Sequence, residues 1–506
     1  MQLQATVRQN QYQDSVRLMQ ISRQASSLPG VAKVLALLGT DSNKKVLADL
    51  GLMDATVAAA TANDLVICVE AETDEAIERA LAEVDARLCA TTTGQVTQEN
   101  PKSLEEAVSR LPGANVAMIS LPGQFAKLDV AAALEQGLHV MLFSDNISLA
   151  DEAELKQRAV EKGLLLMGPD CGTAIINGVA LALANVVRRG EIGLAAASGT
   201  GIQEVTCLID RFGGGVSHAI GVGGRDLKKE IGGAMMCQAI RTLAKDPATK
   251  TLVVLSKPGA PEVMAKVLAE ARASGLMVVT CLLGSDETAG VGGDDSGMTC
   301  VATLEEAAFA ALSRPVPETV LPAALHPRAE TLAPARQYLR GLYSGGTLCY
   351  ETLFLLKDAL DIQSNVAITP ALKLHYPVKG KAHCCVDLGE DEFTQGRPHP
   401  IIDLGLRLER LAEDMADPTV KVILLDLVLG YGANRNPAAE LAEALTAASH
   451  GLPDGGPLVF VHVCGTDADP QNLRVQEELL QKAGAFLFPT NAQAARAALA
   501  VIQGGV

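Results

Sequence analysis

Short apolar runs recur at nearly regular intervals along the middle of this sequence, and they constrain the fold more than any other feature. After residue 104, seven such runs follow one another, at 116–121, 139–143, 164–168, 192–197, 218–222, 251–256 and 277–283. Amphipathic stretches separate most of them. Short strands that alternate with helices are typical of parallel sheets with helices on both faces. We therefore expect an α/β protein made of several doubly wound domains.

The same pattern divides the chain into segments. Residues 1–90 indicate a small N-terminal α/β domain, and 91–103 are polar and read as a linker. Two further domains are expected at 104–186 and 187–313. Five prolines fall within 313–335, so we expect a Pro-rich linker at 314–336, followed by a last domain at 337–506.

Two of these segments share a series of landmarks. The sequence Ser198-Gly-Thr-Gly-x-x-Glu204 is echoed by Ser344-Gly-Gly-Thr-x-x-x-Glu351. Further on, DPATKTLVVL is echoed by DPTVKVILLD, and LMVVTCLLG by PLVFVHVCG. Because all three pairs occur in the same order, the sequence predicts two copies of one domain type. The spacing is longer in the second copy, which predicts an insertion at 362–403.

In each copy, an apolar run leads through a turn of small residues into a helical pattern. Such a turn leaves backbone N–H groups and the positive end of the helix dipole available to an anion. One turn alone is more simply a helix cap. Two copies paired about a pseudo-two-fold axis would aim both helix starts at one phosphate, so we expect a paired anion site. Its candidate residues are Ser198, Gly199, Thr200, Gly201, Ser344, Gly345, Gly346 and Thr347.

Further candidates lie at expected strand ends and in the insertion. The sequence GVGGRDL follows an apolar run, where α/β proteins bind ligands, so Gly223, Gly224 and Arg225 are candidate binding residues. Arg225 would clamp a carboxylate or phosphate, or form a simple ion pair. His399 stands between two prolines on a stiff backbone, with Arg397 close by. We expect His399 to take part in acid–base work or substrate contact, and Arg397 or Arg225 to hold a carboxylate co-substrate as part of the catalytic site.

Composition and missing motifs exclude several function classes. The formal net charge of −17 disfavours nucleic acids and anionic membranes as partners. The sequence has no apolar run long enough to span a membrane and no signal-peptide pattern, so we expect a cytoplasmic protein. It also has no dinucleotide fingerprint or P-loop, which disfavours NAD. The eleven Cys residues include no CxxC pair, and no metal site is expected.

The quoted motifs also carry a family resemblance. The stretch GLLLMGPDCGTAIINGVALALANVVRRGEIGLAAASGTGIQE resembles the junction between the CoA-binding and ligase domains of the succinyl-CoA synthetase alpha subunit. The stretch from SGGTLCYE through DPTVKVILLD to VCGTDADPQN resembles the C-terminal ligase domain of its beta subunit. With QDSVRLMQISR and GRPHPIID included, nearly the whole chain resembles the FdrA family of acyl-CoA synthetase-like proteins.

This resemblance implies a Rossmann-like CoA-binding-type domain at 104–186 and flavodoxin-like ligase-type domains at 187–313 and 337–506. It implies helix starts that aim at a phosphorylated histidine, with Glu204 as a catalytic residue supporting that histidine. The sequence departs from the pattern, because the expected phosphohistidine loop at 284–299 contains no His. An ATP-grasp domain and a glycine-rich CoA loop are also not recognisable. Whether CoA is a cofactor is therefore left open. The implied ligand is a phosphate or an acyl phosphate that this chain does not itself produce.

The FdrA resemblance further implies carbamoyl or acyl transfer in purine and allantoin catabolism. The expected substrates are carbamoyl phosphate, or a related acyl phosphate, and a carboxylic or oxamate-like acid. The implied partners are companion transferase subunits and a carbamate kinase, in a homo- or hetero-oligomer. Two alternatives stay open: an acyl-CoA synthetase with a detached nucleotide-binding partner, and a non-catalytic assembly or sensor protein.

Overall fold

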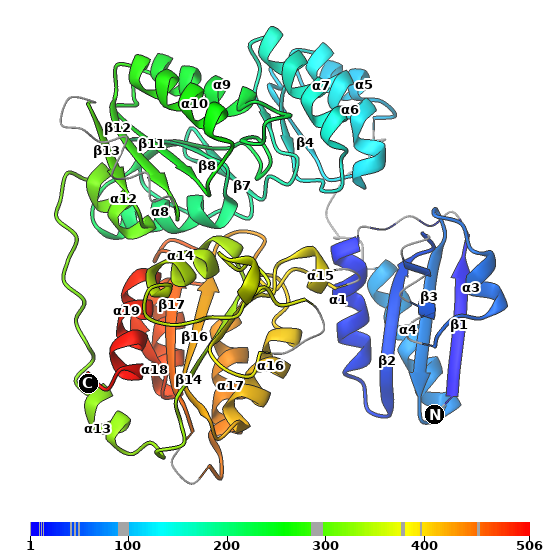
Figure 1. Cartoon of the computed structure of the whole chain (residues 1–506). Helices are drawn as coiled ribbons and strands as arrows, with labels where there is room; N and C mark the ends of the chain where they lie inside the picture. Colours follow the sequence, from blue (N-terminus) through cyan, green and yellow to red (C-terminus); the bar gives the residue numbers. More distant parts are fainter. Residues whose placement is uncertain are drawn as a thin grey trace. The chain divides into compact units, whose positions relative to one another are not determined.

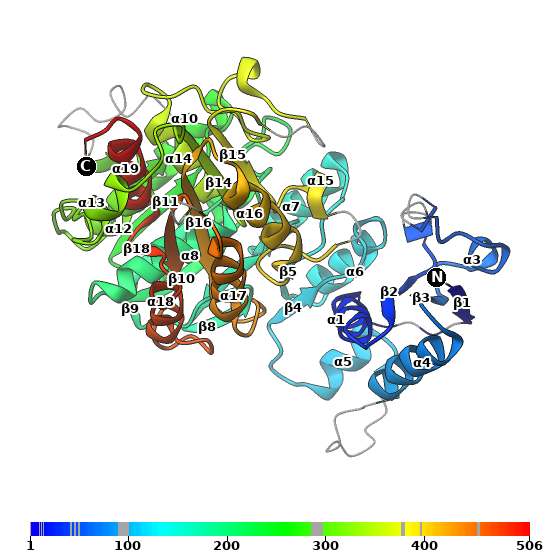
Figure 2. The same ribbon diagram turned by 90° about the horizontal axis from the view of Figure 1, so that it is seen from below.

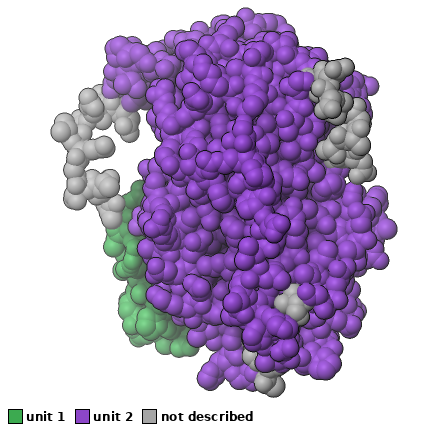
Figure 3. All heavy atoms as spheres, turned by 90° about the vertical axis from the view of Figure 1, so that its left-hand side faces the viewer, with its two compact units in different colours: residues 1–100, 391–398 green, residues 101–390, 399–506 purple. Residues whose placement is uncertain are grey.

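The computed structural model describes the whole chain apart from a set of short gaps. These are residues 1, 10, 12, 14, 41–42, 45–46, 49–50, 90–100, 285–296, 376–379, 395–396, 453–455 and 506. The chain forms two compact units (Figure 3). The smaller unit comprises residues 1–100 and 391–398, and the larger unit comprises residues 101–390 and 399–506.

The smaller unit is built on an antiparallel sheet with the strand order β1-β3-β2. One face buries Leu18, Ile67 and Val84 in a single core, and the other buries Val57 with Val66. Successive residues of a strand point to opposite faces, so β3 supplies both cores. The elements are β1 (Gln2–Arg8), α1 (Ser15–Ser26), β2 (Val31–Leu38), α3 (Ala55–Ala59), β3 (Leu65–Ala71), α4 (Asp74–Cys89) and, from the second segment, α15 (Asp391–Thr394).

The larger unit begins with a parallel sheet in the order β4-β5-β6. Its helices bury Val130, Leu134 and Leu155 against the strands. After its last strand, β6, the chain continues into the second sheet of the unit. The elements are α5 (Leu104–Arg110), β4 (Val116–Ile119), α6 (Gly123–Glu135), β5 (His139–Leu142), α7 (Leu149–Glu161) and β6 (Leu166–Met167).

The second sheet of this unit has the order β13-β12-β11-β9-β10-β7-β8. Strands β9 to β13 are parallel, whereas β7 and β8 form an antiparallel hairpin. Asn177 and Gly178 turn this hairpin, both with positive φ, as a two-residue turn requires. The elements are β7 (Thr173–Ile176), β8 (Val179–Ala182), β9 (Arg189–Ala196), α8 (Gly199–Arg211), β10 (Val216–Gly221), α9 (Ala234–Lys245), β11 (Thr251–Ser256), α10 (Pro261–Ala273), β12 (Met277–Leu282), β13 (Met298–Val301) and α12 (Leu304–Ala311).

The third sheet has the order β15-β14-β16-β17-β18, and all its strands are parallel. Its strand β15 lies within residues 362–403, so the stretch expected as an insertion contains a regular strand of the sheet. The elements are α13 (Leu325–Glu330), β14 (Tyr338–Tyr343), α14 (Gly346–Leu356), η1 (Pro370–Leu372), β15 (Cys384–Asp387), α16 (Gly405–Ala416), β16 (Val420–Val428), α17 (Pro437–Ser449), β17 (Leu458–Cys464), α18 (Leu473–Lys482), β18 (Phe486–Phe488) and α19 (Asn491–Ile502).

The second and third sheets repeat one topology. We number the strands along the chain, starting from β9 in the second sheet and from β14 in the third. In both sheets the strands then lie side by side in the order second, first, third, fourth, fifth. We call β9 to α12 the first repeat and β14 to α19 the second repeat. This order is that of flavodoxin-like doubly wound sheets, and the prediction of an α/β protein with doubly wound domains is confirmed.

The two repeats face each other through their helices. Helices α8 and α12 cover one face of the first repeat, and α14 and α19 cover one face of the second (Figure 1; Figure 2 shows the same elements from below). Helix α8 contacts α14, and α12 contacts α19. Leu194, Ile202, Leu348 and Ala494 belong to one continuous buried core. The repeats are therefore joined by packing, and not only by the chain between them.

None of the described helices is both long and apolar enough to cross a membrane.

Candidate functional site

The turn before α8 is fixed by a cap and by close packing. Ser198 has an extended backbone, and its Oγ accepts a hydrogen bond of 3.0 Å from the N–H of Gly201, as N-cap serines do. A Cβ at Gly201 would lie 2.7 Å from the Leu255 side chain. Glycine therefore allows the helix start to approach strand β11 closely.

The turn before α14 is anchored differently. The backbone N–H and the Oγ of buried Ser344 both donate to the carboxylate of Asp426, at 2.8 and 2.9 Å. Asp426 also forms a buried ion pair of 2.7 Å with Arg407. The N-cap residue of the helix is Gly345, and no side chain caps α14. The first turn of α14 thus keeps backbone N–H groups for another acceptor.

The two helix starts meet. The Oγ of Ser198 and the Oγ1 of Thr347 lie 2.5 Å apart, although 149 residues separate them. A Cβ at Gly345 would lie 2.5 Å from the Thr200 methyl group. The positive ends of two helix dipoles therefore converge on one place, which favours an anion there.

A cation stands beside the start of α14. Lys257 follows β11, and its Nζ lies 3.3 Å from the position a Cβ would take at Gly346. The ammonium also lies over the Tyr350 ring, 5.7 Å from its centroid. Among the described residues, Lys257 has no hydrogen bond and no ion pair. A half-buried ammonium in this position is a ready partner for an anion at the helix starts.

A buried carboxyl group completes this cluster. Asp387, at the end of β15, places its Oδ2 2.5 Å from the position of a Cβ at Gly346. Its Oδ1 accepts a hydrogen bond of 2.9 Å from the N–H of Gly389. Burial and, to a lesser extent, the charge of Glu390 raise the pKa of Asp387 to about 7, against the opposing effects of the Gly389 N–H and of Lys257. Asp387 therefore changes protonation near neutral pH.

His399 lies on the other side of Asp387. The Nε2 of His399, the carbonyl oxygen of Ser344 and the Oδ1 of Asp387 surround one point, the position of a Cβ at Gly389, at 2.6, 2.9 and 3.2 Å. The Nδ1 of His399 accepts a hydrogen bond from the Ile401 N–H. Burial lowers the pKa of His399 to about 4. At neutral pH the ring is therefore uncharged, and its Nε2–H is a hydrogen-bond donor rather than a base.

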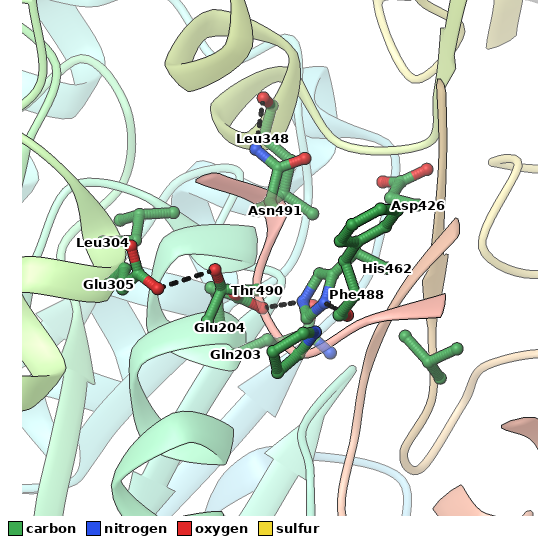
Figure 4. Close-up of polar contacts among 12 residues, drawn as sticks. Gln203, Glu204, Leu304, Glu305, Leu348, Asp426, His462, Phe488, Thr490 and Asn491 are labelled. Carbon is green, nitrogen blue, oxygen red and sulfur yellow. Dashed lines mark hydrogen bonds and ion pairs between the residues drawn. The ribbon is translucent and has the colours of Figure 1, made fainter. Parts of the chain in front are cut away.

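Glu204 makes a contact that the sequence does not predict. Its Oε2 lies 2.7 Å from the Nε2 of His462 on β17 of the second repeat, and the two side chains point toward one another in Figure 4. The Nδ1 of His462 lies 3.2 Å from the carbonyl oxygen of Phe488. Burial lowers the pKa of His462, but the charge and hydrogen bond of Glu204 outweigh it, so that pKa is raised overall.

Glu351 is the counterpart of Glu204 in the second repeat. It accepts hydrogen bonds from the Leu304 N–H, at 2.7 Å, and from the Asn491 amide, at 2.8 Å. Burial raises the pKa of Glu351 to about 7, although these two hydrogen bonds lower it. Each central helix thus places a buried carboxyl group against the opposite repeat, where it needs a partner.

The remaining candidate residues make other contacts. Arg225 forms an ion pair of 2.8 Å with Glu152 and donates to the Ile147 carbonyl. Gly223 has a φ of +85° and lies against the backbone at Pro169, whereas a Cβ at Gly224 would lie 4.0 Å from the carbonyl oxygen of Ala197, directly before Ser198. Arg397 is exposed and belongs to the smaller unit. Most of the loop expected to carry a phosphohistidine, residues 285–296, lies outside the described residues.

Sequence reasoning missed Lys257, Asp387 and His462. Each had a weak signal, because each is a polar residue within or directly after an apolar run: VVLSK, HCCVD and VFVHV. Such a residue either finds a partner in the core or lies at a strand's carboxyl end, where ligands bind. The sequence does not say which residue it faces.

The three-stranded sheet β4-β5-β6 was expected to be CoA-binding. Its loops pack tightly, since a Cβ at Gly123 would lie 1.9 Å from the Asp145 carbonyl. The buried Ser144 Oγ has no hydrogen-bond partner among the described residues. The nearby cations are already engaged: Lys156 is buried between Glu152 and Asp226, and Arg225 is paired. These cations therefore offer no unpaired positive charge to a phosphate group at this sheet.

The fold and the site together are those of a CoA-ligase-like protein in which one chain carries two repeats of the same doubly wound sheet. A family model described as CoA-ligase matches residues 342–501, and one described as AllF, heavy metal-associated domain, matches residues 1–104. The Escherichia coli (strain K12) protein named "Uncharacterized protein YahF" is 41% identical over 498 residues, which cover 96% of each chain. This chain belongs to the YahF family.

Shorter matches are to subunits of acyl-CoA ligases. The ADP-forming sulfoacetate-CoA ligase subunit SqwL of Acholeplasma sp is 31% identical over 152 residues, which cover 29% of this chain and 50% of SqwL. The alpha subunit of the ADP-forming succinate–CoA ligase of Aquifex aeolicus is 28% identical over 166 residues, which cover 32% of this chain and 53% of that subunit. This chain thus spans about half the length of these ligase subunits.

The smaller unit does not fit a heavy metal, despite the description of the family that matches it. Soft metals prefer Cys, His and Met ligands, and the sequence QNQYQD between β1 and α1 contains none. Cys68 is buried in β3, and burial raises the pKa of its thiol to about 11. Among the described residues, no group of three or more His, Cys, Asp or Glu could hold a metal ion.

Proposed function

We propose that this chain is an enzyme subunit that binds an acyl phosphate, with carbamoyl phosphate as the first candidate, and transfers its acyl or carbamoyl group. The observation that carries the proposal is the 2.5 Å approach of Ser198 to Thr347 at the starts of α8 and α14. Lys257 beside Gly346 adds a free positive charge. Paired helix starts and an ammonium are a suitable set of donors for a phosphate group.

Each residue of the cluster has a defined part in this proposal. The hydroxyls of Ser198 and Thr347 and the N–H groups of the first turns hold the phosphate oxygens. Lys257 stabilises the negative charge that grows on the phosphate as it leaves. Thr200 and Gly345 keep the two turns in close contact, since a Cβ at Gly345 would lie 2.5 Å from the Thr200 methyl group, whereas a Cβ at Gly346 would lie 2.5 Å from the Asp387 Oδ2.

The choice of an acyl phosphate rather than a phosphohistidine rests on the sequence. The loop at 284–299 contains no His, and the buried His462 is held by Glu204 and by Phe488. The phosphate at the helix starts is therefore proposed to arrive on the substrate. The match of residues 1–104 to an AllF domain supports a role in allantoin-type nitrogen catabolism. The proposed context is cytoplasmic, with an oxamate-like acid as acceptor and with companion transferase subunits and a carbamate kinase as partners.

A second candidate function is formation of an acyl-CoA together with a detached nucleotide-binding partner. It is favoured by the CoA-ligase match over 342–501 and by the two ligase subunits. The paired cations around Glu152 count against it.

Isothermal titration calorimetry of the full chain separates these functions. We expect inorganic phosphate and carbamoyl phosphate to bind, and CoA and ATP to bind weakly or not at all. Absence of binding by both phosphate and carbamoyl phosphate would contradict the proposal. Tight CoA binding would favour the second function. Binding of none of these ligands, together with capture of partner proteins, would favour an assembly protein.

A further inference from the structure

A cavity of about 590 Å³ opens where the end of α8 meets the second repeat. It is lined by the segment before β9, the last turn of α8, the loop after β17 and the start of α18. Helix α8 runs from Gly199 to Arg211, which is about 18 Å at the usual rise per residue. The cavity thus lies at the other end of α8 from Ser198 and is separate from the proposed anion site. Its volume is in the range of small-molecule sites.

Charged side chains of both signs line this cavity. Among the described residues, they are in equal numbers: Arg188, Arg211 and Arg474, and Asp210, Asp467 and Glu477. A ligand with one sign of charge would be repelled by half of these groups, whereas a ligand with both signs meets an opposite charge at each end. The helix ends agree with this, because the cavity receives the negative end of the α8 dipole and the positive end of the α18 dipole. The lining therefore favours a zwitterion.

Two of the three ion pairs are closed and lie at the rim. The Nε of Arg188 lies 2.9 Å from the Oδ1 of Asp210, and the Nε of Arg474 lies 2.9 Å from the Oδ2 of Asp467. The two arginine side chains are 58% and 79% exposed. Exposed pairs of this kind contribute little free energy, so they frame the cavity rather than select its ligand.

The third ion pair lies deeper and is open. The side chains of Arg211 and Glu477 are 19% and 27% exposed, and 3.6 Å separates Nη2 from Oε1, which is too long for a hydrogen bond. The Nη1 of Arg211 donates only to backbone carbonyls, those of Val463 and Pro489, at 3.5 and 3.2 Å. Among the described residues, Glu477 accepts no hydrogen bond. Both groups thus keep hydrogen-bonding capacity for a ligand in the cavity that they line.

We propose that this cavity binds a small zwitterion of the α-amino acid class, with its carboxylate on Arg211 and its ammonium on Glu477. An α-amino acid carries both charged groups on one carbon atom, so they can reach two partners that lie 3.6 Å apart. A guanidinium binds a carboxylate through parallel N–H groups, and a carboxylate accepts hydrogen bonds from an ammonium. This inference does not depend on the proposed function, because the cavity lies at the other end of α8.

Thermal unfolding of the full chain with each common L-amino acid at millimolar concentration tests this site. We expect at least one amino acid to raise the melting temperature, because a ligand that binds the folded state stabilises it. The N-acetyl derivative of that amino acid lacks the ammonium, and its amide derivative lacks the carboxylate. Neither derivative should raise the melting temperature, since each loses one of the two charged contacts.

Titration calorimetry with the same amino acid then locates the site. Arg211→Met and Glu477→Gln should each weaken binding about tenfold or more, since each removes a charged hydrogen-bonding group. Glu477→Gln keeps the length of the side chain, so it tests the site even where Arg211→Met impairs folding. The control is Arg241→Met, because Arg241 pairs with Glu270 outside the cavity. That variant should bind the amino acid as the wild type does.

Each outcome decides for or against the proposal. No shift with any amino acid overturns it. An equal shift with the N-acetyl derivative indicates an anion site, and an equal shift with the amide derivative indicates a cation site, and either result overturns the zwitterion. Unchanged affinity in Glu477→Gln places the ligand elsewhere. A chain that binds an amino acid here but no phosphate contradicts the proposed function and leaves this inference in place.

Discussion

Glu204 and His462 form a buried ion pair that joins the two repeats, with 2.7 Å between Oε2 and Nε2 and only 1% of each side chain exposed. Glu204 lies on α8 of the first repeat and His462 on β17 of the second. The ion pair and the contact of Ser198 with Thr347 both join the α8 segment to the second repeat. We therefore expect the ion pair to help hold α8 where its start meets that of α14.

Removal of one partner of this ion pair should lower the stability of the folded chain. His462→Ala leaves the Glu204 carboxylate buried without its charged partner, and we expect the free energy of unfolding to fall by about 3–5 kcal/mol. Urea unfolding followed by circular dichroism measures this change. The control is His326→Ala, because His326 is 63% exposed and lies 3.7 Å from Glu330. That control should cost less than about 0.5 kcal/mol. Equal losses in the two variants would show that the buried pair adds no stability.

The ion pair should also make stability depend on pH. Glu204 raises the pKa of His462 above its ordinary value of 6.5, so folding favours the protonated ring. The stability from this pair is fully present below about pH 6.5 and is lost as pH rises through the higher folded pKa. The melting temperature of Glu204→Gln should therefore differ from that of the wild type more at about pH 6 than at about pH 9. A difference that grows toward alkaline pH would reverse the assigned direction.

Gly346 should tolerate no side chain. A Cβ there would lie 2.5 Å from the Asp387 Oδ2 and 3.3 Å from the Lys257 Nζ. Gly346→Ala should thus weaken phosphate binding by at least about tenfold, which is about 1.4 kcal/mol. Gly172→Ala is the matched control, since its nearest neighbour would lie at 3.9 Å, and its affinity should stay within about twofold. Similar affinities for the two variants would mean that the phosphate does not bind beside Gly346.

The smaller unit should not bind soft metals. Stoichiometric Zn²⁺ or Cu⁺ should leave the melting temperature of the full chain unchanged, because a ligand that binds the folded state raises it. Equilibrium dialysis with metal analysis gives the second readout. A tightly bound equivalent of metal that is lost in Cys68→Ser would contradict this prediction.

The two repeats could be predicted from the sequence, because the apolar runs and the glycine turns that mark them are local features. The pairing of Ser198 with Thr347 follows from the prediction that two copies face each other. The sequence could not place Asp387 beside Gly346, or His462 beside Glu204. Those contacts depend on the register of β15 and β17 within the second repeat and on the packing of α8 against it. His399 shows the same limit, since its burial and the Ile401 N–H make it a donor, which a proline-flanked histidine does not reveal.

The central claim is that phosphate binds where the two helix starts meet, beside Lys257. Titration calorimetry of phosphate into the wild type, Lys257→Met and Lys250→Met tests it most directly. Lys250 is exposed just before the same strand and donates to the Pro247 carbonyl. A hydrogen bond to a charged group contributes about 1.5–3 kcal/mol, so Lys257→Met should bind phosphate about 10- to 100-fold more weakly, and Lys250→Met should match the wild type. Equal affinity in all three proteins would contradict the claim.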